Sequence, residues 1–284
     1  LYCRQPKILI VHHVHQEVFR KYLPKPLSKL ALFIESQITP NIYRHQKIVT
    51  VSPSTKDDLI NMGRANDENV EIVSPGVNIP DKRFPKTTNP SFIYMGRLKP
   101  YKNIDIAITA FSEVSKKYPE STLTIAGFGE IIGDLKRLVR KLDLNDKVKI
   151  LGRVTDEERL KLLSESWIAV QPSSFEGWGI TVLEANASGT PVIASNVKGL
   201  RDSVIDGETG ILVPVRDIAK LTQAMERLLS NSKLREMLSQ NAYQWSLRFN
   251  WEHAAGRFER VLQIAVSERR LLSGRLNVAE TNSN

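Results

Sequence analysis

Two acidic residues, Glu176 and Glu184, stand at the ends of a nine-residue segment, EGWGITVLE. An apolar run that is typical of a buried strand, residues 167–173, precedes this segment, and the pattern of a helix end and another strand follows it in residues 185–195. The region therefore has the pattern of a strand, a loop and a helix. In open parallel sheets, ligands bind beyond the carboxyl ends of the strands, where such a loop would lie.

The helix that is expected to begin at Gly179 and Ile180 would direct unpaired backbone N–H groups and a positive dipole end at an anion such as phosphate. With a rise of about 1.5 Å per helical residue, the two carboxylates would lie on the order of 10 Å apart, one on each side of that anion. Carboxylates accept hydrogen bonds from sugar hydroxyls, so a nucleotide sugar fits this arrangement. The alternative is that Glu184 is an ordinary solvated helix residue, since such spacings also arise by chance.

Two cations follow a predicted strand, residues 91–96. Arg97 and Lys102 lie in the segment GRLKPYKN and would reach the same edge of the sheet as the helix end at Gly179. Fixed cations at this place would stabilise the negative charge that develops on a departing diphosphate. The simpler reading of Lys102 alone is a surface lysine at the start of a helix.

Two further strand ends carry candidate binding residues. Gly127 opens the segment GFG, which is interpreted as a backbone that approaches a ligand. It is not a dinucleotide fingerprint, because Ile132 stands where the third glycine would be, so no nicotinamide cofactor is expected. Arg153 follows Gly152 at another strand end and is expected to border the nucleobase.

Three histidines, His12, His13 and His15, cluster after the first predicted strand. They lack an accompanying acid or cysteine, so a metal site is not expected there. The sequence also contains no D-x-D triplet of the kind that holds a metal and a diphosphate. Two cations and a helix dipole can replace a divalent ion electrostatically, so we predict neither a metal nor a cofactor.

Strands and helices alternate regularly after Pro90, which predicts an α/β fold with a parallel, doubly wound sheet. One helix is expected over residues 103–118, and two more are expected over residues 233–248 and 251–268. We predict four parts, which are a partial N-terminal domain (1–85), a ligand-binding domain (86–250), a helix that packs back on the first domain (251–270), and a disordered tail (271–284). The proline-rich residues 78–90 are interpreted as the linker.

The composition describes a globular chain of 284 residues with 41% hydrophobic content and a formal net charge of +9. The surplus of basic residues could favour phosphates, an anionic membrane or nucleic acid, but these residues are dispersed and no nucleic-acid-binding motif accompanies them, so nucleic acid is not expected. The only cysteine is Cys3, which favours a reducing cytoplasm. No apolar run is long enough to span a membrane. Because Leu1 is not a methionine, the sequence could begin within a longer protein.

A basic stretch from Arg20 to Lys29 also carries large apolar residues, namely Phe19, Tyr22, Leu23, Leu27 and Leu30. One reading is peripheral contact with an anionic membrane, on the inner face, and with a lipid-linked acceptor. The other reading is a solvated face over an ordinary core.

Five blocks, in order along the chain, carry a resemblance to a known family: FIYMGRLKPYKNIDIAITAF, LTIAGFGE, VKILGRV, VQPSSFEGWGITVLEANASGTPVIAS and DGETGILV. The chain resembles the donor-binding domain of group 1 (family 4) retaining glycosyltransferases, which have the GT-B architecture of two Rossmann-like domains. The resemblance implies that Arg97 and Lys102 bind the diphosphate, that Glu176 contacts the donor sugar, and that Glu184 contacts the ribose. Gly96, directly before Arg97, is expected to belong to the donor-binding residues. It also implies that backbone N–H groups hold the sugar and phosphate, and these belong to Gly177, Trp178, Gly179, Ile180 and Thr181. His12 matches the position that faces the donor sugar from the opposite domain, and the Trp178 ring is interpreted as packing or a cleft wall.

The implied function is transfer of a hexose from a nucleotide-diphosphate sugar to a glycan or lipid-linked acceptor, with retention of configuration and without a protein nucleophile. The chain departs from the family pattern in two places. From the resemblance we expect this sequence to lack the opening strands and glycine-rich loop of the first domain, and Lys198 in KGLRD stands in place of one of two glycines. A non-catalytic nucleotide-sugar-binding module is therefore an alternative, and a nucleotide-sugar 2-epimerase of the same fold is another.

Overall fold

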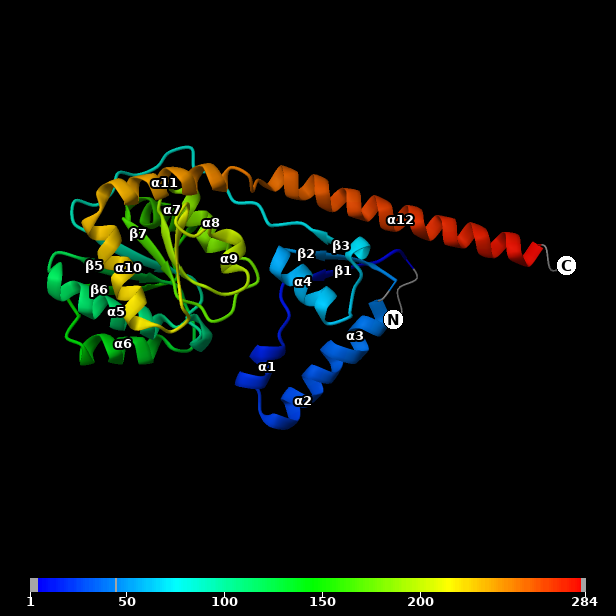
Figure 1. Ribbon diagram of the computed structural model, residues 1–284, viewed down its shortest axis with the longest axis horizontal. Helices are drawn as coiled ribbons and strands as arrows, with labels where there is room; N and C mark the ends of the chain where they lie inside the picture. Colours follow the sequence, from blue (N-terminus) through cyan, green and yellow to red (C-terminus); the bar gives the residue numbers. More distant parts are fainter. Residues whose placement is uncertain (1–4, 44, 282–284) are drawn as a thin grey trace. The chain divides into compact units, whose positions relative to one another are not determined.

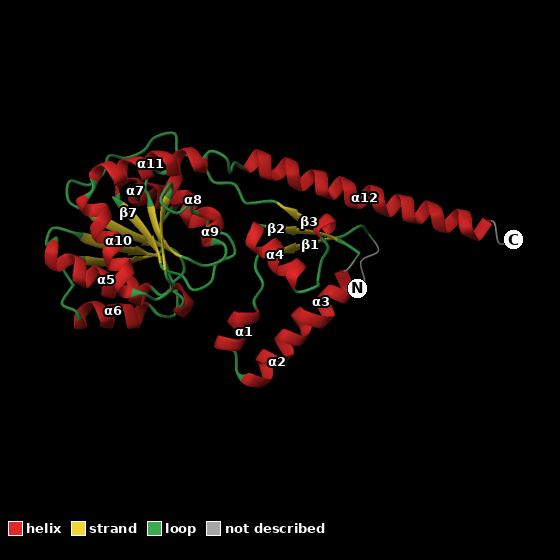
Figure 2. Ribbon diagram, viewed as in Figure 1, coloured by secondary structure: helices red, strands yellow, loops and turns green. Residues whose placement is uncertain are grey.

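A computed structural model describes residues 5–43 and 45–281, so that Cys3 lies outside the described residues. The chain divides into two compact units. The smaller unit consists of Leu1–Gly76 and Trp251–Asn284, and the larger unit consists of Val77–Asn250. Figure 1 shows the order of the elements along the chain, and Figure 2 shows that helices surround a sheet in the larger unit.

The larger unit is built on a parallel sheet of six strands in the order β6-β5-β4-β7-β8-β9. The central strand β4 pairs on both sides, so that Ile93 stands beside Thr124 of β5 and Ala169 of β7. These strands are short apolar runs that are buried on both faces, as parallel strands usually are. Their bounds are β4 (Ser91–Met95), β5 (Thr122–Ala126), β6 (Val148–Gly152), β7 (Ile168–Gln171), β8 (Val192–Ser195) and β9 (Gly210–Val213).

Helices cover both faces of this sheet, because alternate residues of each strand point to opposite sides. On one side, Phe92 and Tyr94 pack with α5, α6 and α10, whereas on the other side Ile93 and Met95 pack with α7, α8 and α9. The doubly wound α/β fold predicted from the sequence is confirmed. The helices are α5 (Ile104–Lys117), α6 (Ile132–Lys141), α7 (Asp156–Glu165), α8 (Ile180–Ala187), α9 (Leu200–Ser203), α10 (Ile218–Ser230) and α11 (Ser232–Ser246).

The strand order places a topological switch point between β4 and β7. From β4 the chain proceeds outward to β5 and β6, and it then returns to β7 and continues in the other direction. The loops that follow β4 and β7 therefore diverge to opposite faces of the sheet, which is the arrangement at which open α/β sheets bind ligands. These two loops, residues 96–103 and 172–179, contain most of the predicted site residues.

The smaller unit has a parallel sheet in the order β1-β2-β3. Leu59 of α4 packs against one face of this sheet, while Ala254 and Val261 of α12 pack against Val49 and Val73 on the other face. The elements are β1 (Ile8–Val11), α1 (Gln16–Tyr22), α2 (Lys25–Phe33), the π-helix η1 (Ile34–Ile38), α3 (Thr39–Tyr43), β2 (Lys47–Thr50), α4 (Pro53–Asn61), the 3-10 turn η2 (Asp67–Asn69), β3 (Val70–Ile72) and α12 (Trp251–Thr281).

The boundary between the units lies at Val77, earlier than the residue 86 that the sequence suggested. The proline-rich segment, expected to be a linker, packs on the larger unit. Lys86 Nζ donates hydrogen bonds to Ser166 O at 2.7 Å and to Thr190 Oγ1 at 2.6 Å. Burial, together with the nearby Arg83 and Arg235, lowers the pKa of Lys86 to about 7. The hydrogen bonds of Lys86 therefore attach the proline-rich segment to the larger unit.

Helix α12 extends to Thr281, beyond the end that the sequence indicated at residue 268. It thus includes most of residues 271–284, for which a disordered tail was expected, and residues 282–284 lie outside the described part of the chain. The physical reason is composition, since residues such as Leu, Arg, Ala and Glu in this segment have high helix propensity.

The GFG segment after β5 has a packing role that the sequence did not reveal. A Cβ atom at Gly127, which has φ of +149°, would overlap with the carbonyl oxygen of Gly96. The backbone of the loop after β5 thus lies directly against the loop after β4, which contains Arg97 and Lys102. Glycine at position 127 allows this approach. We therefore assign to Gly127 the role of positioning the loop that carries Arg97 and Lys102.

We expect Gly127→Ala to lower the free energy of unfolding by about 2–4 kcal/mol, because the new methyl group would force two backbone segments apart. The matched control is Gly152→Ala, at another strand end with positive φ, where an added Cβ would have no atom within 4 Å. That variant should lose only about 1–2 kcal/mol, the cost of a left-handed conformation. Urea unfolding measures both values, and equal losses would contradict the packing role of Gly127.

Candidate functional site

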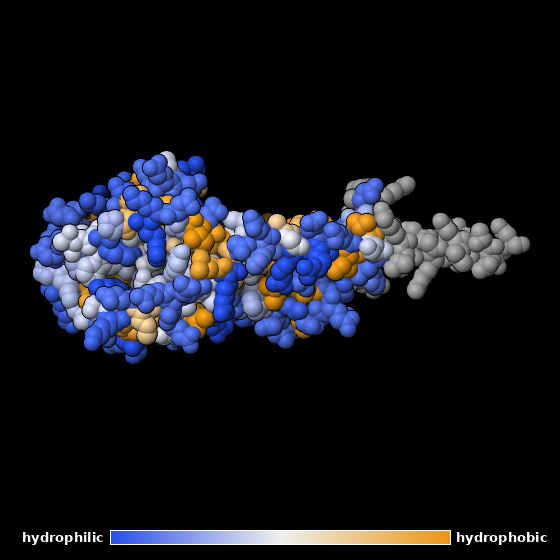
Figure 3. Space-filling model, turned by 90° about the horizontal axis from the view of Figure 1, so that it is seen from above, coloured by the Kyte–Doolittle hydropathy of each residue, from blue (hydrophilic) through white to orange (hydrophobic). Residues whose placement is uncertain are grey.

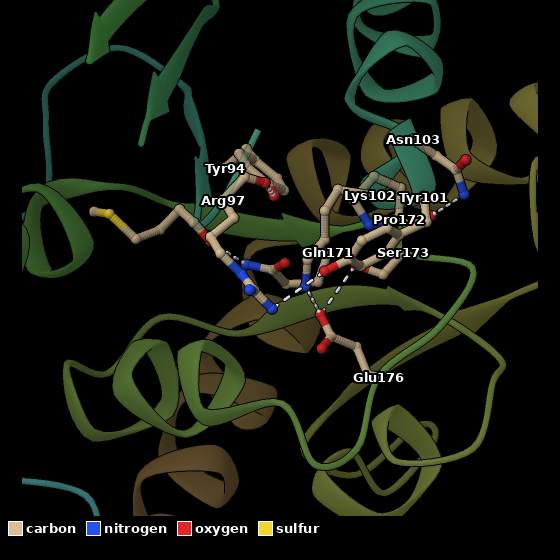
Figure 4. Close-up of polar contacts among 10 residues, drawn as sticks. Tyr94, Arg97, Tyr101, Lys102, Asn103, Gln171, Pro172, Ser173 and Glu176 are labelled. Carbon is tan, nitrogen blue, oxygen red and sulfur yellow. Dashed lines mark hydrogen bonds and ion pairs between the residues drawn. The ribbon is translucent and has the colours of Figure 1, made fainter. Parts of the chain in front are cut away.

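The loop after β4 holds two cations close to the sheet. Lys102 lies in the 3-10 turn η3 (Pro100–Lys102) and is 7% exposed, whereas Arg97 is exposed. The Arg97 Nη2 atom donates a hydrogen bond to the Tyr101 hydroxyl at 3.2 Å, and the Lys102 ammonium lies 5.3 Å from the centre of the Tyr101 ring. Tyr101 therefore connects the two cations (Figure 4).

Tyr94, on β4, holds the backbone of this loop through its hydroxyl group. Its hydroxyl donates a hydrogen bond to the carbonyl oxygen of Arg97 at 2.9 Å. Burial is the largest cause that raises the pKa of Tyr94 well above its usual value, and Glu176 and Tyr101 raise it further. The hydroxyl therefore keeps its proton and remains a hydrogen-bond donor to the loop.

Glu176, in the loop after β7, forms an ion pair with Lys102. Both side chains are largely buried, with 9% of Lys102 and 19% of Glu176 exposed. The Ser173 hydroxyl donates a second hydrogen bond to Glu176 Oε1 at 3.1 Å. Figure 4 shows Lys102, Ser173 and Glu176 pointing toward one another from the two loops.

Asn103 fixes the same two loops together through its amide group. Its Nδ2 atom donates hydrogen bonds to Pro172 O at 2.8 Å and to Ser174 Oγ at 2.7 Å. Asn103 is 1% exposed and has φ of +50°, a conformation that asparagine tolerates better than most residues. The spacing between the loop after β4 and the loop after β7 is therefore set by both an ion pair and an amide.

The loop after β7 ends at the start of α8, whose first residue is Ile180 and whose N-cap residue is Gly179. No side chain caps this helix end, so backbone N–H groups of its first turn keep their capacity to bind an anion. The loop after β8 packs against the backbone of Glu176, since a Cβ atom at Gly199 would overlap with the carbonyl oxygen of Glu176.

Glu184 lies on α8 apart from the contacts between Lys102 and Glu176. Its Oε1 atom accepts a hydrogen bond from Arg159 Nη1 of α7 at 3.1 Å. Burial raises the pKa of Glu184 above its ordinary value of 4.5, and Arg159 partly opposes this shift. Sequence reasoning missed Arg159. The only signal was an arginine in the acidic start of the preceding helix, DEERL.

Trp178 has the packing role that was one of its two interpretations. The residue is 5% exposed, and its ring lies edge-on to Phe249 at a centroid distance of 5.2 Å. Phe249 in turn packs against Trp245 at 5.1 Å. Three aromatic rings thus anchor the loop that carries Glu176 to the end of α11.

Arg153, after β6, lies over the ring of Phe128 with its guanidinium carbon 3.9 Å from the ring centre. Phe128 belongs to the GFG segment and is 49% exposed. A guanidinium stacked on an exposed aromatic ring is a flat surface of the kind on which a planar ligand group can rest. Sequence reasoning found Arg153 and missed Phe128, although Phe128 lies between the two glycines it discussed.

The histidines lie in the smaller unit, where a cavity of about 320 Å³ is present. His15 contacts a neighbouring acid, because its backbone N–H donates to Glu35 Oε1 at 2.8 Å. Among the described residues, no group of three or more histidine, cysteine or acidic residues is placed to hold a metal ion. The cavity is lined by Leu9, Ile10, Val11, His12, His13, Val14, His15, Glu35, Thr39, Pro40, Tyr43, Ile48, Leu59 and Arg64.

Residues 78–245 match the family model of the glycosyl transferases group 1. The chain belongs to this family. The match includes both loops of the switch point, and the resemblance stated from the sequence is confirmed. Within the described residues, no helix combines the length and apolar character needed to cross a membrane.

Two relatives and one solved structure illustrate the similarity of the chain. It is 28% identical to a glycogen synthase of Mycobacterium tuberculosis over 280 residues, which cover 97% of this chain and 67% of that protein. It is also 28% identical to a D-inositol 3-phosphate glycosyltransferase of Corynebacterium diphtheriae, covering 75% of this chain and 55% of that protein. HepE of Anabaena, solved in complex with UDP-glucose, superposes with a TM-score of 0.78 at 20% identity, covering 92% of this chain and 72% of that one. The chain thus spans roughly half to two thirds of the length of these relatives.

We expect Glu184→Gln to change the pH dependence of stability. Because the pKa of Glu184 is raised in the folded state, the folded protein binds the proton more tightly than the unfolded chain. Wild-type stability should therefore fall as the pH rises from below 4.5 through the raised pKa, and the variant should lack this part of the loss.

The measurement is urea unfolding of both proteins between pH 4 and pH 7. The matched control is Glu120→Gln, which removes an exposed carboxylate from a turn of the same unit. A difference between wild type and Glu184→Gln that does not grow with pH would show that burial of the carboxylate has no energetic consequence.

Proposed function

We propose that the protein transfers a hexose from a nucleotide-diphosphate sugar to an acceptor hydroxyl with retention of anomeric configuration. The observation that carries the proposal is the buried contact between Lys102 and Glu176, at the switch point and beside the uncapped end of α8. It places a cation for the diphosphate and a carboxylate for sugar hydroxyls within one small site. Membership of the group 1 family supports the same reading.

The donor would lie across the carboxyl ends of the strands of the larger unit. We assign the diphosphate to Arg97, Lys102 and the backbone N–H groups at the start of α8, because these are its fixed positive groups. We assign the sugar hydroxyls to Glu176. The ribose would lie near Glu184, and the nucleobase would rest against the flat surface formed by Arg153 and Phe128.

The transfer reaction requires stabilisation of the negative charge that develops on the departing diphosphate. As the bond from the anomeric carbon to the diphosphate oxygen breaks, its electron pair moves to that oxygen, and Lys102 and Arg97 offset the new charge. The acceptor hydroxyl then forms the new bond on the same face, and its proton goes to an oxygen of the departing phosphate. This route requires no protein nucleophile and leaves Glu176 a binding role.

The bound donor would change the partners of Lys102. In the free protein, the ammonium is largely buried against Glu176, so it is held in place before the donor arrives. A diphosphate oxygen that approaches Lys102 competes with the carboxylate for the ammonium, and Glu176 gains freedom to accept hydrogen bonds from the sugar. One ion pair would therefore preorganise both groups.

We expect Lys102→Gln to lower the rate of transfer by about 10²–10³-fold, the usual loss when one fixed charge at a leaving group is removed. The control is Lys99→Gln in the same loop, because Lys99 forms a more exposed ion pair with Glu130 at 2.8 Å and should affect transfer little. Since Lys102→Gln also leaves Glu176 buried without its partner, the thermal unfolding of each variant is measured alongside transfer. A folded Lys102→Gln protein with normal activity would remove Lys102 from the mechanism.

We also expect transfer to proceed without a divalent metal ion. The reason is that two cations and a helix end supply the positive charge that a metal would otherwise bring to the diphosphate. Activity should be unchanged after dialysis against EDTA, and addition of Mg²⁺ or Mn²⁺ should raise it less than about twofold. Loss of activity on chelation, with recovery on addition of one of these ions, would contradict this expectation.

The second candidate is a module that binds the donor nucleotide without turnover, because the residues assigned to the diphosphate and the nucleoside all lie in the larger unit. Calorimetric titration with UDP and GDP sugars, combined with a product assay, separates the two functions. Binding without transfer or donor hydrolysis would support the module. A nucleotide-sugar 2-epimerase would instead be recognised by conversion of the donor in the absence of an acceptor.

The acceptor is proposed to be a glycan or a lipid-linked sugar. The smaller unit would supply its contacts, since it holds the cavity that His12 lines. His12 is proposed as a residue that transfer requires, in line with its position in the family pattern. A His12→Ala variant that keeps donor binding but loses transfer would support this assignment.

A further inference from the structure

Arg216 has a backbone conformation that is uncommon for residues other than glycine. It lies in the turn between β9 and α10, which is closed by a hydrogen bond from Asp217 N–H to Pro214 O at 3.3 Å. Its φ of +60° is in the left-handed region, and the third residue of a turn with that conformation favours glycine. Among the described residues, Asn103 and Asp143 are the other non-glycine residues with positive φ. An arginine at such a position points to a role for its side chain.

The guanidinium of Arg216 contacts the site through Asn103. Its Nη1 atom donates a hydrogen bond to Asn103 Oδ1 at 3.0 Å. Exposed charged side chains are ordinary on this protein, and Figure 3 shows one face on which hydrophilic residues predominate. Arg216 differs from an ordinary exposed arginine, because its half-exposed side chain reaches an amide that is almost completely buried. Its other contact, with Asp105 at 3.9 Å, joins two half-exposed groups and is weak by comparison.

The hydrogen bond from Arg216 helps to determine which way the Asn103 amide faces. The amide oxygen accepts from Arg216, while Nδ2 donates to Pro172 O and to Ser174 Oγ. If the amide turned over, its NH₂ group would face the guanidinium and its oxygen would face the carbonyl oxygen of Pro172. Both contacts would be unfavourable, because they place donor against donor and acceptor against acceptor. Arg216 therefore stabilises the orientation in which the amide joins the two loops.

The amide of Asn103 acts on residues next to both groups of the central ion pair. Lys102 directly precedes Asn103 in the chain. Ser173, whose hydroxyl donates to Glu176 Oε1 at 3.1 Å, lies between the two residues that accept hydrogen bonds from the amide. A change in the amide would thus displace the cation and the carboxylate relative to each other.

We propose that Arg216 is a positioning residue for hexose transfer, which acts through the Asn103 amide to hold Lys102 and Glu176 in place relative to each other. The inference rests on the proposed function, since it assigns Arg216 to the same reaction. It adds the loop after β9 to the parts of the chain that transfer requires.

The first test replaces Arg216 by methionine, which has no hydrogen-bond donor, and by lysine, which keeps one. We expect Arg216→Met to lower kcat by about tenfold, because displaced groups stabilise the transition state less well. The KM for the donor should change by less than about threefold, and Arg216→Lys should keep kcat within about threefold of wild type. The control is Arg227→Met, which changes an exposed arginine of α10 and should leave kcat unaltered. Titration with UDP counts the binding sites, so that kcat is expressed per folded site.

Arg216→Gly separates the backbone from the side chain. This variant removes the guanidinium and relieves the left-handed conformation at the same time. We expect it to unfold at a higher temperature than Arg216→Met and yet to have the same low kcat. Its control is Asp143→Gly, at another position with positive φ, which should keep the wild-type kcat. A kcat that rises with the unfolding temperature across these variants would assign Arg216 to stability alone and overturn the proposal.

A double-mutant cycle tests whether Arg216 acts through Asn103. The background is Asn103→Gly, because glycine accepts the positive φ of this position. There, Arg216→Met should lower kcat by less than about twofold, since the amide through which the guanidinium acts is absent. The full tenfold loss in this background would contradict the proposed route.

Hydrogen exchange tests the same link without reference to catalysis. The backbone N–H of Ser174 donates to Tyr101 O at 2.8 Å, so its exchange reports on the contact between the two loops. Exchange in residues 172–176 should be at least about fivefold faster in Arg216→Met than in wild type or Arg227→Met. Unchanged exchange would overturn the positioning role, whether or not the protein transfers a hexose. A wild-type protein without transfer, combined with faster exchange in Arg216→Met, would instead refute the proposed function and retain the link between Arg216 and the loops.

Discussion

The contact between Lys102 and Glu176 is the interaction on which the rest of the site depends. It joins the loop after β4 to the loop after β7, which leave neighbouring strands in opposite directions at the switch point of the sheet. A buried ion pair contributes little to stability in itself, because both groups lose their hydration, but breaking one partner is costly. The role of this ion pair is to hold its two groups in fixed positions. The pair holds a cation and a carboxylate in place, and the amide of Asn103 secures the same two loops.

Further residues around this ion pair hold the loops of the site in position. Tyr94 keeps its proton because it is buried, and it holds the backbone of Arg97. Gly127 and Gly199 bring neighbouring loops within contact of Gly96 and Glu176, where a side chain would not fit. Glu184 is kept partly buried beside Arg159, although burial disfavours its ionised form. This carboxylate is the one that the proposed function assigns to the ribose.

The fold could be predicted from the sequence to a large extent, because strand and helix periodicities are local. The helix expected over residues 103–118 is an example, since α5 covers Ile104–Lys117 in the structure. The pairing of Lys102 with Glu176 follows in part from the parallel sheet, which brings strand ends together, but the partner of Glu184 does not. Arg159 lies on another helix, and no spacing rule predicts which side chains of two packed helices will meet. The same holds for Phe128 and Arg153, which come from the loops after two different strands.

The most direct test of the central claim is a crystal structure of the chain with a bound nucleoside diphosphate, UDP or GDP, chosen by thermal shift. The account predicts that the distal phosphate lies within hydrogen-bonding distance of Lys102 Nζ and of the first backbone N–H groups of α8. It also predicts that the guanidinium of Arg97 turns toward the phosphate. A complex in which the diphosphate lies elsewhere, while Lys102 remains paired with Glu176, would contradict the account.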